Sequence, residues 1–187
     1  FLALKISYIN EIANLCEKLG ANIQDVSRGM GYDSRIGNKF LNAGIGYGGS
    51  CFPKDTKALH WLSVQSGVEL KTVKACIEVN KAQKIRLFEK LKSDLTNLKN
   101  VNVAVLGLTF KPGTDDLREA PSIYNIELLL DAGVIIKAYD PISIESFKRR
   151  ISYKLEDDGI IGSISYYTDI DSAIMDTEAV LIMTEWP

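Results

Sequence analysis

The stretch AGIGYGGSCFPKD, residues 43–55, gathers four glycines, a cysteine, a lysine and an aspartate. A cysteine thiolate is a strong nucleophile, and the positive end of a helix favours the thiolate over the thiol. Proline suits the first position of a helix, so we expect a helix to begin at Pro53, just after Cys51. Covalent catalysis by Cys51 is one interpretation, and a small buried cysteine at a tight turn is the other. Local physics favours neither.

Two charged residues follow the cysteine at the start of the predicted helix. Lys54 adds positive charge near the thiol, whereas Asp55, expected in the first turn, acts against it. A carboxylate four residues from a thiol is better suited to moving water or protons than to activating sulfur. The alternative is that Asp55 is an ordinary first-turn acid.

The glycines Gly44, Gly46 and Gly49 satisfy the pattern G-x-G-x-x-G, but their context argues against a dinucleotide fingerprint. That fingerprint needs a strand before it and a helix opening directly on it, and RIGNKFLN, residues 35–42, is not a β run. A phosphate-binding P-loop is excluded because the last glycine precedes Ser-Cys instead of Lys-Ser. Glycines still let backbone N–H groups approach a ligand closely. We therefore expect this loop to contact a ligand by another mode.

The remaining cysteines and the single histidine offer no second reactive centre. Cys16 and Cys76 belong to or adjoin apolar helical stripes, which predicts that both are core residues. His60 has no Cys or Ser at a triad-like position. One histidine and three cysteines without metal-type spacing predict no metal site.

Composition narrows the function classes further. The 187 residues are 46% hydrophobic and 25% charged, which is typical of a globular protein. The net charge of −2 offers no basic field for nucleic acid. No apolar run approaches the roughly 18 to 20 residues of a membrane span. Three cysteines without a disulfide framework indicate a reducing compartment, and we expect a cytoplasmic protein.

The first half of the chain has helical periodicity. Glycines separate the expected helices, which cover residues 1–19, 22–30, 53–66 and 69–94. The last of these is long enough to join domains or to pair with a second copy of itself. The chain begins without Met inside a helical pattern and ends just after an apolar run. We interpret it as an internal piece of a longer protein.

From residue 101 the pattern changes to short β-rich runs that alternate with helices. The expected strands are 101–107, 134–141, 164–168 and 178–184, and the expected helices are 122–133, 143–149 and 170–175. This alternation predicts a parallel, doubly wound sheet. Ligands of such sheets bind beyond the carboxyl ends of the strands, where this chain carries residues 107–119, Asp140-Pro141 and residues 184–187.

Three stretches together resemble the NAD-dependent sugar-nucleotide 6-dehydrogenases of the UDP-glucose/GDP-mannose dehydrogenase family. They are RIGNKFLNAGIGYGGSCFPKD, LGLTFKPGTDDLREAPS and TEW, and the likeness extends over the whole chain. The resemblance implies an all-α central dimerisation region with the catalytic loop, residues 1–95. It also implies a truncated UDP-sugar-binding α/β domain with a Rossmann-like parallel sheet, residues 96–187. The family's N-terminal NAD-binding domain is absent from this chain.

The resemblance also implies a reaction. Family members oxidise a sugar nucleotide at C6 by four electrons, and Cys51 matches the nucleophile that carries the thiohemiacetal and thioester. Asp55 matches the aspartate that positions or activates water. The family's catalytic Lys and Asn lie upstream of Phe1, so Lys5 and Asn10 are not their counterparts.

The stretch SRIGNKFLNAGIGYGG favours UDP-glucose over GDP-mannose as substrate, with UDP-glucuronate as product and NAD as cofactor. The fragment alone is expected to be inactive, and a non-catalytic nucleotide-sugar-binding and dimerisation module is the third interpretation.

Binding residues are implied position by position. Substrate contacts are assigned to Phe40, Leu41, Asn42, Ala43, Gly44, Ile45, Gly46, Tyr47, Gly48, Phe110 and Lys111. Arg35 matches an arginine donated by the neighbouring subunit of a homodimer, and Lys54 and Arg118 match NAD contacts. Many relatives carry Lys where this chain has Asn42, which puts its phosphate contact in doubt. Without the resemblance, Lys111 and Arg118 would belong to a solvated charged loop.

Overall fold

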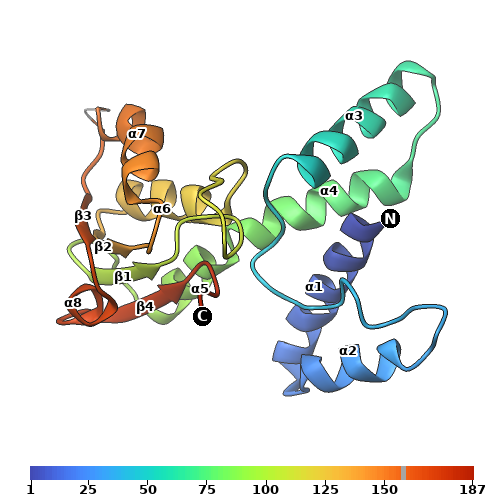
Figure 1. The fold of residues 1–187 in the computed structure, drawn as a ribbon, viewed down its shortest axis with the longest axis horizontal. Coiled ribbons are helices and arrows are strands. Elements are labelled where there is room, and N and C mark those ends of the chain that lie inside the picture. The colour runs from blue at the N-terminus through green and yellow to red at the C-terminus, as the bar shows by residue number, and fades with distance from the viewer. Residues whose placement is uncertain (157–158) are drawn as a thin grey trace. The chain divides into compact units, whose positions relative to one another are not determined.

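The computed structural model describes residues 1–156 and 159–187, and the chain divides into two compact units (Figure 1). We call Phe1–Gln83 the helical unit and Lys84–Pro187 the sheet unit. The expected order, a helical region followed by a parallel-sheet domain, is confirmed. The division falls earlier in the chain than the boundary expected after residue 95.

The helical unit contains α1 (Leu2–Leu19), α2 (Ile23–Gly31), α3 (Cys51–Gln65) and nearly all of α4 (Lys71–Lys84). Local sequence explains where the first two meet. Gly20 ends α1 in a left-handed conformation (φ 69°) that glycine adopts without steric cost. Asn22 then caps α2, because its side-chain oxygen accepts a hydrogen bond from the backbone N–H of Gln24 at 2.8 Å.

The prediction of one continuous helix over residues 69–94 is wrong. The helix breaks at Ile85, whose ψ of 4° is not helical, and α5 (Arg86–Asp94) begins after it. Asn125 of the sheet unit satisfies the backbone at this break. Its side-chain nitrogen donates to the carbonyl of Lys84 at 2.6 Å, and its oxygen accepts from the N–H of Phe88 at 3.0 Å. This tertiary contact stabilises an interruption that helical periodicity cannot reveal.

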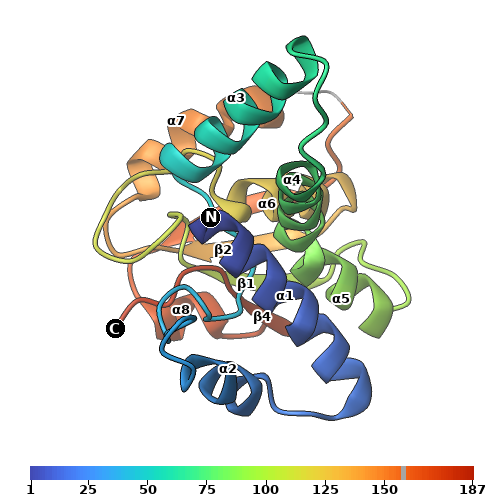
Figure 2. The same cartoon turned by 90° about the vertical axis from the view of Figure 1, so that its right-hand side faces the viewer.

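The sheet unit alternates strands and helices after α5. Its elements are β1 (Asn102–Leu106), α6 (Pro121–Asp131), β2 (Ile135–Tyr139), α7 (Ile144–Leu155), β3 (Ser163–Tyr167), α8 (Ile170–Ile174) and β4 (Ala179–Ile182). The strand order is β3-β2-β1-β4, and every pairing is parallel, as predicted. Helices α6 and α7 cover one face of the sheet and α8 the other (Figures 1 and 2). Helix α7 extends well past the predicted 143–149.

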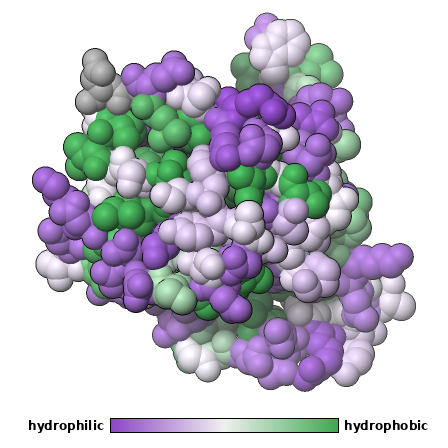
Figure 3. Space-filling view, turned by 60° about the vertical axis from the view of Figure 1, so that its left-hand side comes forward, coloured by the Kyte–Doolittle hydropathy of each residue, from purple (hydrophilic) through white to green (hydrophobic). Residues whose placement is uncertain are grey.

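The core of the sheet unit forms around the central strand β1, in which Val103, Ala104 and Val105 are all fully buried. A parallel strand covered on both faces needs such an unbroken apolar run. Edge strand β4 differs, because Val180 and Ile182 are 46% and 59% exposed. The face of the molecule in Figure 3 mixes hydrophobic with hydrophilic residues.

Candidate active site

Helix α3 begins at Cys51 itself, so the expectation that the helix starts at Pro53 is wrong. Proline also fits the third helical residue, because an N–H in the first turn has no intrahelical acceptor to lose. Ser50 precedes the helix, and its Oγ lies 3.8 Å from the sulfur of Cys51. The thiol is exposed at the end of the helix where the partial positive charge of the backbone stabilises an anion.

Asp55 lies one helical turn beyond Cys51, and the first turn of α3 contains no acidic residue. This corrects the expectation that Asp55 lies in the first turn. Side chains four residues apart share a helix face, so the thiol and the carboxylate project from the same side of α3. Lys54 Nζ lies 3.3 Å from an oxygen of Asp55, and both side chains are largely exposed. Such exposed ion pairs contribute little stability, so Asp55 is available for chemistry.

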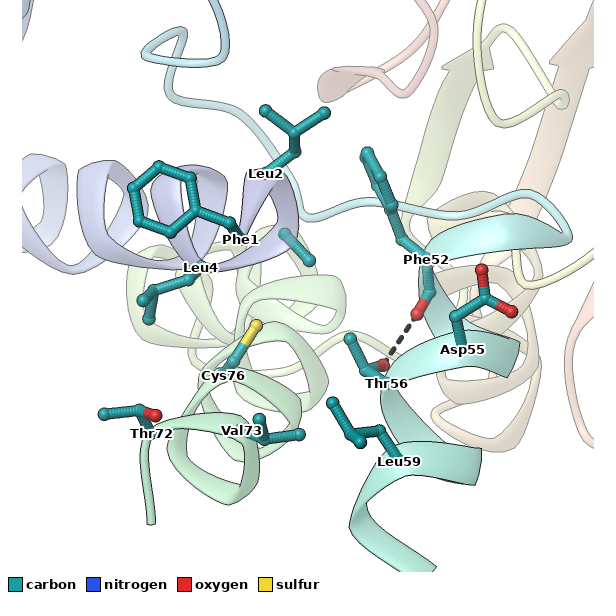
Figure 4. Close-up of a pocket in the computed structure, with 11 residues that line it drawn as sticks. Phe1, Leu2, Leu4, Phe52, Asp55, Thr56, Leu59, Thr72, Val73 and Cys76 are labelled. Carbon is teal, nitrogen blue, oxygen red and sulfur yellow. Dashed lines mark hydrogen bonds between the residues drawn. The ribbon is translucent and has the colours of Figure 1, made fainter. Parts of the chain in front are cut away.

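A cavity of about 490 Å³ opens between α1, α3 and α4, and Asp55 lies at its edge (Figure 4). Most of the lining is apolar, from Phe52 and Leu59 of α3 to Val73 of α4. The hydroxyl of Thr56 donates to the carbonyl of Phe52 at 2.6 Å and so adds no free donor. The carboxylate of Asp55 thus lies between an apolar cavity and solvent.

Cys76 belongs to the buried core, as predicted, and so does Cys16. The sulfur of Cys76 lies 3.3 Å from Ser7 Oγ and 3.5 Å from the hydroxyl of Tyr47. Burial, and then the contact with Cys76, raises the pKa of the Tyr47 phenol well above its ordinary value. Tyr47 therefore keeps its proton, and its ring packs edge-to-face on Phe52, 5.6 Å between centroids. The glycine loop is thereby anchored beside the start of α3.

The glycine loop is held by side-chain amides that sequence reasoning missed. The N–H of Gly44 donates to Asn10 Oδ1 at 2.8 Å, and the carbonyl of Gly44 accepts from Gln83 Nε2 at 2.7 Å. Asn14 in turn holds the side chain of Gln83 by donating a hydrogen bond to Gln83 Oε1 at 2.9 Å. A loop without regular structure needs such partners for its backbone groups.

The same device recurs three residues along the loop. Asn80 binds Tyr47 twice, accepting from its N–H at 2.8 Å and donating to its carbonyl at 3.0 Å. We call Asn10, Asn14, Asn80 and Gln83 the amide clamp. The available sequence signal was the placing of amides within otherwise apolar helix faces, with Asn80 and Gln83 one turn apart in α4.

A second cavity, of about 700 Å³, lies against this loop. Five of the predicted substrate residues line it: Phe40, Asn42, Gly44, Gly46 and Tyr47. Ile6, Asn10, Asn38 and Lys39 complete the lining. The structure thus brings most of the predicted loop residues to one space. Lys5 fixes the segment before the loop by donating to the carbonyls of Ile36 and Lys39 at 2.9 and 2.6 Å.

Other predicted substrate residues do not line this space. Leu41 is buried and lines a separate cavity of about 270 Å³, together with Arg35. Arg35 also pairs with Asp33, with a shortest distance of 2.5 Å, and this contact lowers the pKa of the Asp33 carboxyl. Ala43, Ile45 and Gly48 contribute to the loop but not to the cavity lining.

In the sheet unit, the predicted binding residues lie in the segment between β1 and α6. Lys111 Nζ lies 5.3 Å from the ring centroid of Phe110, whose N–H donates to the carbonyl of Asp116 at 3.1 Å. The carboxylate of Asp116 binds Arg118 through its backbone N–H and its guanidinium, at 2.7 to 2.9 Å. The segment therefore presents Lys111 and Arg118 as ordered, exposed cations.

Comparison with known proteins decides the family. Residues 1–82 match the central domain of the UDP-glucose/GDP-mannose dehydrogenase family, and residues 104–187 match that family's UDP binding domain. The chain belongs to this family. It is 47% identical over 188 residues to UDP-glucose 6-dehydrogenase TuaD of Bacillus subtilis, and 44% identical over 187 residues to UDP-glucose 6-dehydrogenase of Rickettsia felis. These matches cover 100% of the chain but only 39% and 40% of the two relatives.

Solved dehydrogenases share the fold. A UDP-glucose dehydrogenase from the archaeon Pyrobaculum islandicum superimposes with a TM-score of 0.92 at 36% identity, covering 100% of this chain and 41% of that one. A GDP-mannose dehydrogenase from Pseudomonas aeruginosa gives a TM-score of 0.63 at 25% identity, covering 96% and 41%. The chain thus spans about 40% of the length of its relatives.

One motif at the carboxyl edge of the sheet holds the fold together. Asp140, at the end of β2, is buried and accepts hydrogen bonds from the N–H groups of Leu108, Ile142 and Ser143 and from Trp186 Nε1. Its carboxylate joins the end of β1, the start of α7 and the C-terminal motif. Little acceptor capacity is left for a ligand.

Two absences concern the part of the chain that the structure describes. Within residues 1–156 and 159–187, no group of three or more His, Cys, Asp or Glu side chains is arranged to hold a metal ion. Within the same ranges, no helix has both the length and the apolar character needed to cross a membrane.

The ion pair of Asp116 and Arg118 predicts that the thermal stability of the chain depends on pH. Hydrogen bonding to Arg118 lowers the pKa of Asp116 below its ordinary 3.8. A lowered carboxyl pKa means that the pair stabilises the fold above that ordinary value and loses its effect as pH falls through the lowered pKa. We expect the melting temperature to fall more steeply below about pH 4 in the natural chain than in Asp116→Asn. Parallel melting curves between pH 2 and 6 would contradict this assignment.

Proposed function

We propose that this chain is the central and UDP-binding part of an NAD-dependent UDP-glucose 6-dehydrogenase, an oxidoreductase that converts UDP-glucose to UDP-glucuronate. The observation that carries the proposal is the exposed thiol of Cys51 at the first residue of α3, directly after the glycine loop. Identities of 44–47% to proteins named UDP-glucose 6-dehydrogenase support the choice of substrate.

In this reaction, Cys51 carries the second half of the oxidation. Its thiolate forms a C–S bond to the C6 aldehyde, and the oxygen takes up a proton to give a thiohemiacetal. Loss of a hydride and a proton from that adduct gives a thioester. Water then attacks the thioester, the C–S bond breaks, and the carboxylate product leaves with the thiol restored. Asp55, on the same face of α3, accepts a proton from this water.

NAD, when bound, accepts one hydride in each of the two oxidation steps. The predicted NAD contacts in this chain are two exposed cations, Lys54 on α3 and Arg118 beside α6. Cationic side chains of this kind suit the pyrophosphate of NAD. The glycine loop lacks the preceding strand of a dinucleotide fingerprint. We therefore place the NAD-binding domain outside this chain, in line with its 39–41% coverage of relatives.

The nucleotide-sugar binds, in this proposal, in the cavity of about 700 Å³ against the glycine loop. A space of this size suits a ligand as large as a sugar nucleotide. Phe110 and Lys111 lie in the sheet unit, which matches the family's UDP binding domain, and we assign them to nucleotide binding within that unit. We place the enzyme in the cytoplasm, because Cys16, Cys51 and Cys76 are free thiols that a reducing compartment preserves.

The test is turnover by the full-length dehydrogenase that carries this chain, with UDP-glucose, GDP-mannose and UDP-N-acetyl sugars compared side by side. We expect two NADH per UDP-glucose and UDP-glucuronate as product. Preference for GDP-mannose or an acetylated sugar would keep the reaction class and change the substrate. Absence of NADH formation with all of them would leave the chain a non-catalytic binding module.

We also propose a homodimer through the helical unit, to which a second copy brings its Arg35. Trp61 and Val64, three residues apart on one face of α3, are 64% and 56% exposed. Apolar side chains on one helix face are suited to a contact with a second copy. Sedimentation at micromolar concentration should give twice the 20.7 kDa of the chain, and Trp61→Glu should lower this mass. A folded natural chain that sediments as a monomer would contradict the proposal.

A further inference from the structure

Among the described residues, only one of the two polar groups of the Asn10 side-chain amide has a hydrogen-bond partner. Asn10 lies in α1 with 0% of its surface exposed, and its Oδ1 accepts from the N–H of Gly44 at 2.8 Å. Its Nδ2 is buried and has no hydrogen-bond partner among the described residues. Flipping the amide does not help, because the oxygen is needed opposite the Gly44 N–H. A buried N–H without a partner is rare and unfavourable, so it requires an explanation.

The rest of the amide clamp makes this exception clear. Asn80 uses both its oxygen and its nitrogen on Tyr47, and Gln83 uses both on Gly44 and Asn14. Both polar groups of Asn80 and of Gln83 are thus hydrogen-bonded. A role limited to holding the loop does not account for the spare donor of Asn10.

Asn10 borders the cavity that the proposed function assigns to the nucleotide-sugar. Asn10 lines the space of about 700 Å³ together with Gly44 and Lys39. A Cβ added at Gly44 would meet nothing within 4 Å, and the φ of Gly44 is not in the left-handed range. The fold therefore does not require glycine there, and the open space in front of Gly44 is available to a ligand.

We propose that Asn10 is a positioning residue that also binds the nucleotide-sugar. Its Oδ1 holds Gly44, and its Nδ2 donates to an acceptor oxygen of the ligand, either a phosphate or a uracil carbonyl. Lys39 lines the same cavity, and its ammonium group can donate hydrogen bonds but cannot accept them. It therefore also favours a ligand group that accepts hydrogen bonds. The inference rests on the proposed function, since it assigns a contact within that substrate site.

The test compares Asn10→Asp with Gln83→Leu in the full-length dehydrogenase. Asn10→Asp keeps the acceptor for Gly44 and removes the donor, so we expect the Kd for UDP-glucose to rise about 10- to 100-fold. Lowering the pH should restore affinity, because a protonated carboxyl again offers a donor. Gln83→Leu loosens the other side of Gly44 without touching the donor, so its Kd should change less and without this pH dependence.

The outcomes separate this inference from the proposed function. If the natural enzyme oxidises UDP-glucose and Asn10→Asp binds it equally well, the inference is wrong and the proposed function stands. If the natural enzyme neither binds nor oxidises UDP-glucose, the proposed function is wrong.

A measurement on the natural sequence avoids dependence on a variant that fails to fold. The side-chain NH₂ signal of Asn10, observed by NMR with ¹⁵N-asparagine, should shift on addition of UDP. A shift with uridine as well would assign the contact to the base, and a shift with UDP alone would assign it to phosphate. No shift with either ligand, while both bind, would overturn the inference.

Discussion

Replacing Cys51 by serine should lower turnover of UDP-glucose by several orders of magnitude while leaving its binding largely intact. A serine hydroxyl without an adjacent base is a much weaker nucleophile than a thiolate, and an oxygen ester hydrolyses more slowly than a thioester. The side chain is exposed at the start of α3, so the exchange removes no buried contact. The measurements are kcat with UDP-glucose and NAD, and Kd by calorimetry.

Asp55→Asn is the matched comparison on the same face of α3. It leaves the thiol able to capture the aldehyde and impairs proton transfer from water, so the covalent adduct should accumulate. Mass spectrometry of the peptide containing Cys51 would detect that added mass. Near-normal formation of UDP-glucuronate by Cys51→Ser would rule out the covalent mechanism and leave Cys51 as a small residue at a turn.

Asn125→Leu should lower the free energy of unfolding by about 2–4 kcal/mol, the largest stability effect that we expect. The fully buried side chain makes hydrogen bonds to Lys84 O, Pro121 O and Phe88 N, at 2.6 to 3.0 Å. Leucine has a similar volume but no polar atoms, so it leaves backbone groups at the break between α4 and α5 without partners.

Urea unfolding of the parent and the variant would measure this loss from the shift in midpoint. Asn97→Ala is the control, because Asn97 is exposed and accepts a single hydrogen bond, from Lys99 N at 3.0 Å. Its unfolding free energy should change by less than about 1 kcal/mol. Equal midpoints for Asn125→Leu and the parent would show that the buried amide does not support the break.

The parts of the fold that could be predicted are those encoded by local pattern. Gly20 and Asn22 mark the end of one helix and the start of the next, and both signals are visible in the sequence. The unbroken apolar run around Val103, followed by an amphipathic helix and a second strand, determines a parallel pair. The order and type of the elements could therefore be predicted, but their exact bounds and the break between α4 and α5 could not.

What could not be predicted depends on contacts between distant residues. The break at Ile85 relies on Asn125, which lies 40 positions away in the sequence numbering. The first residue of α3 could not be predicted from Pro53, because proline fits any position of a first helical turn. The helix begins at Cys51 instead. At the site, the motif drew attention to Cys51 and Asp55. No local pattern marks Asn10, because its contact with the loop depends on the fold bringing Gly44 beside it.

The exposed edge of β4 has a practical consequence for any work with this chain in isolation. An edge strand carries unpaired backbone groups, and Val180 and Ile182 add apolar side chains to it. Two copies can join edge to edge by continuing the sheet, which is a route to self-association unrelated to catalysis. A lysine in place of Val180 blocks that route. Association that persists with this substitution belongs to another surface, and only such association tests the homodimer proposed through the helical unit.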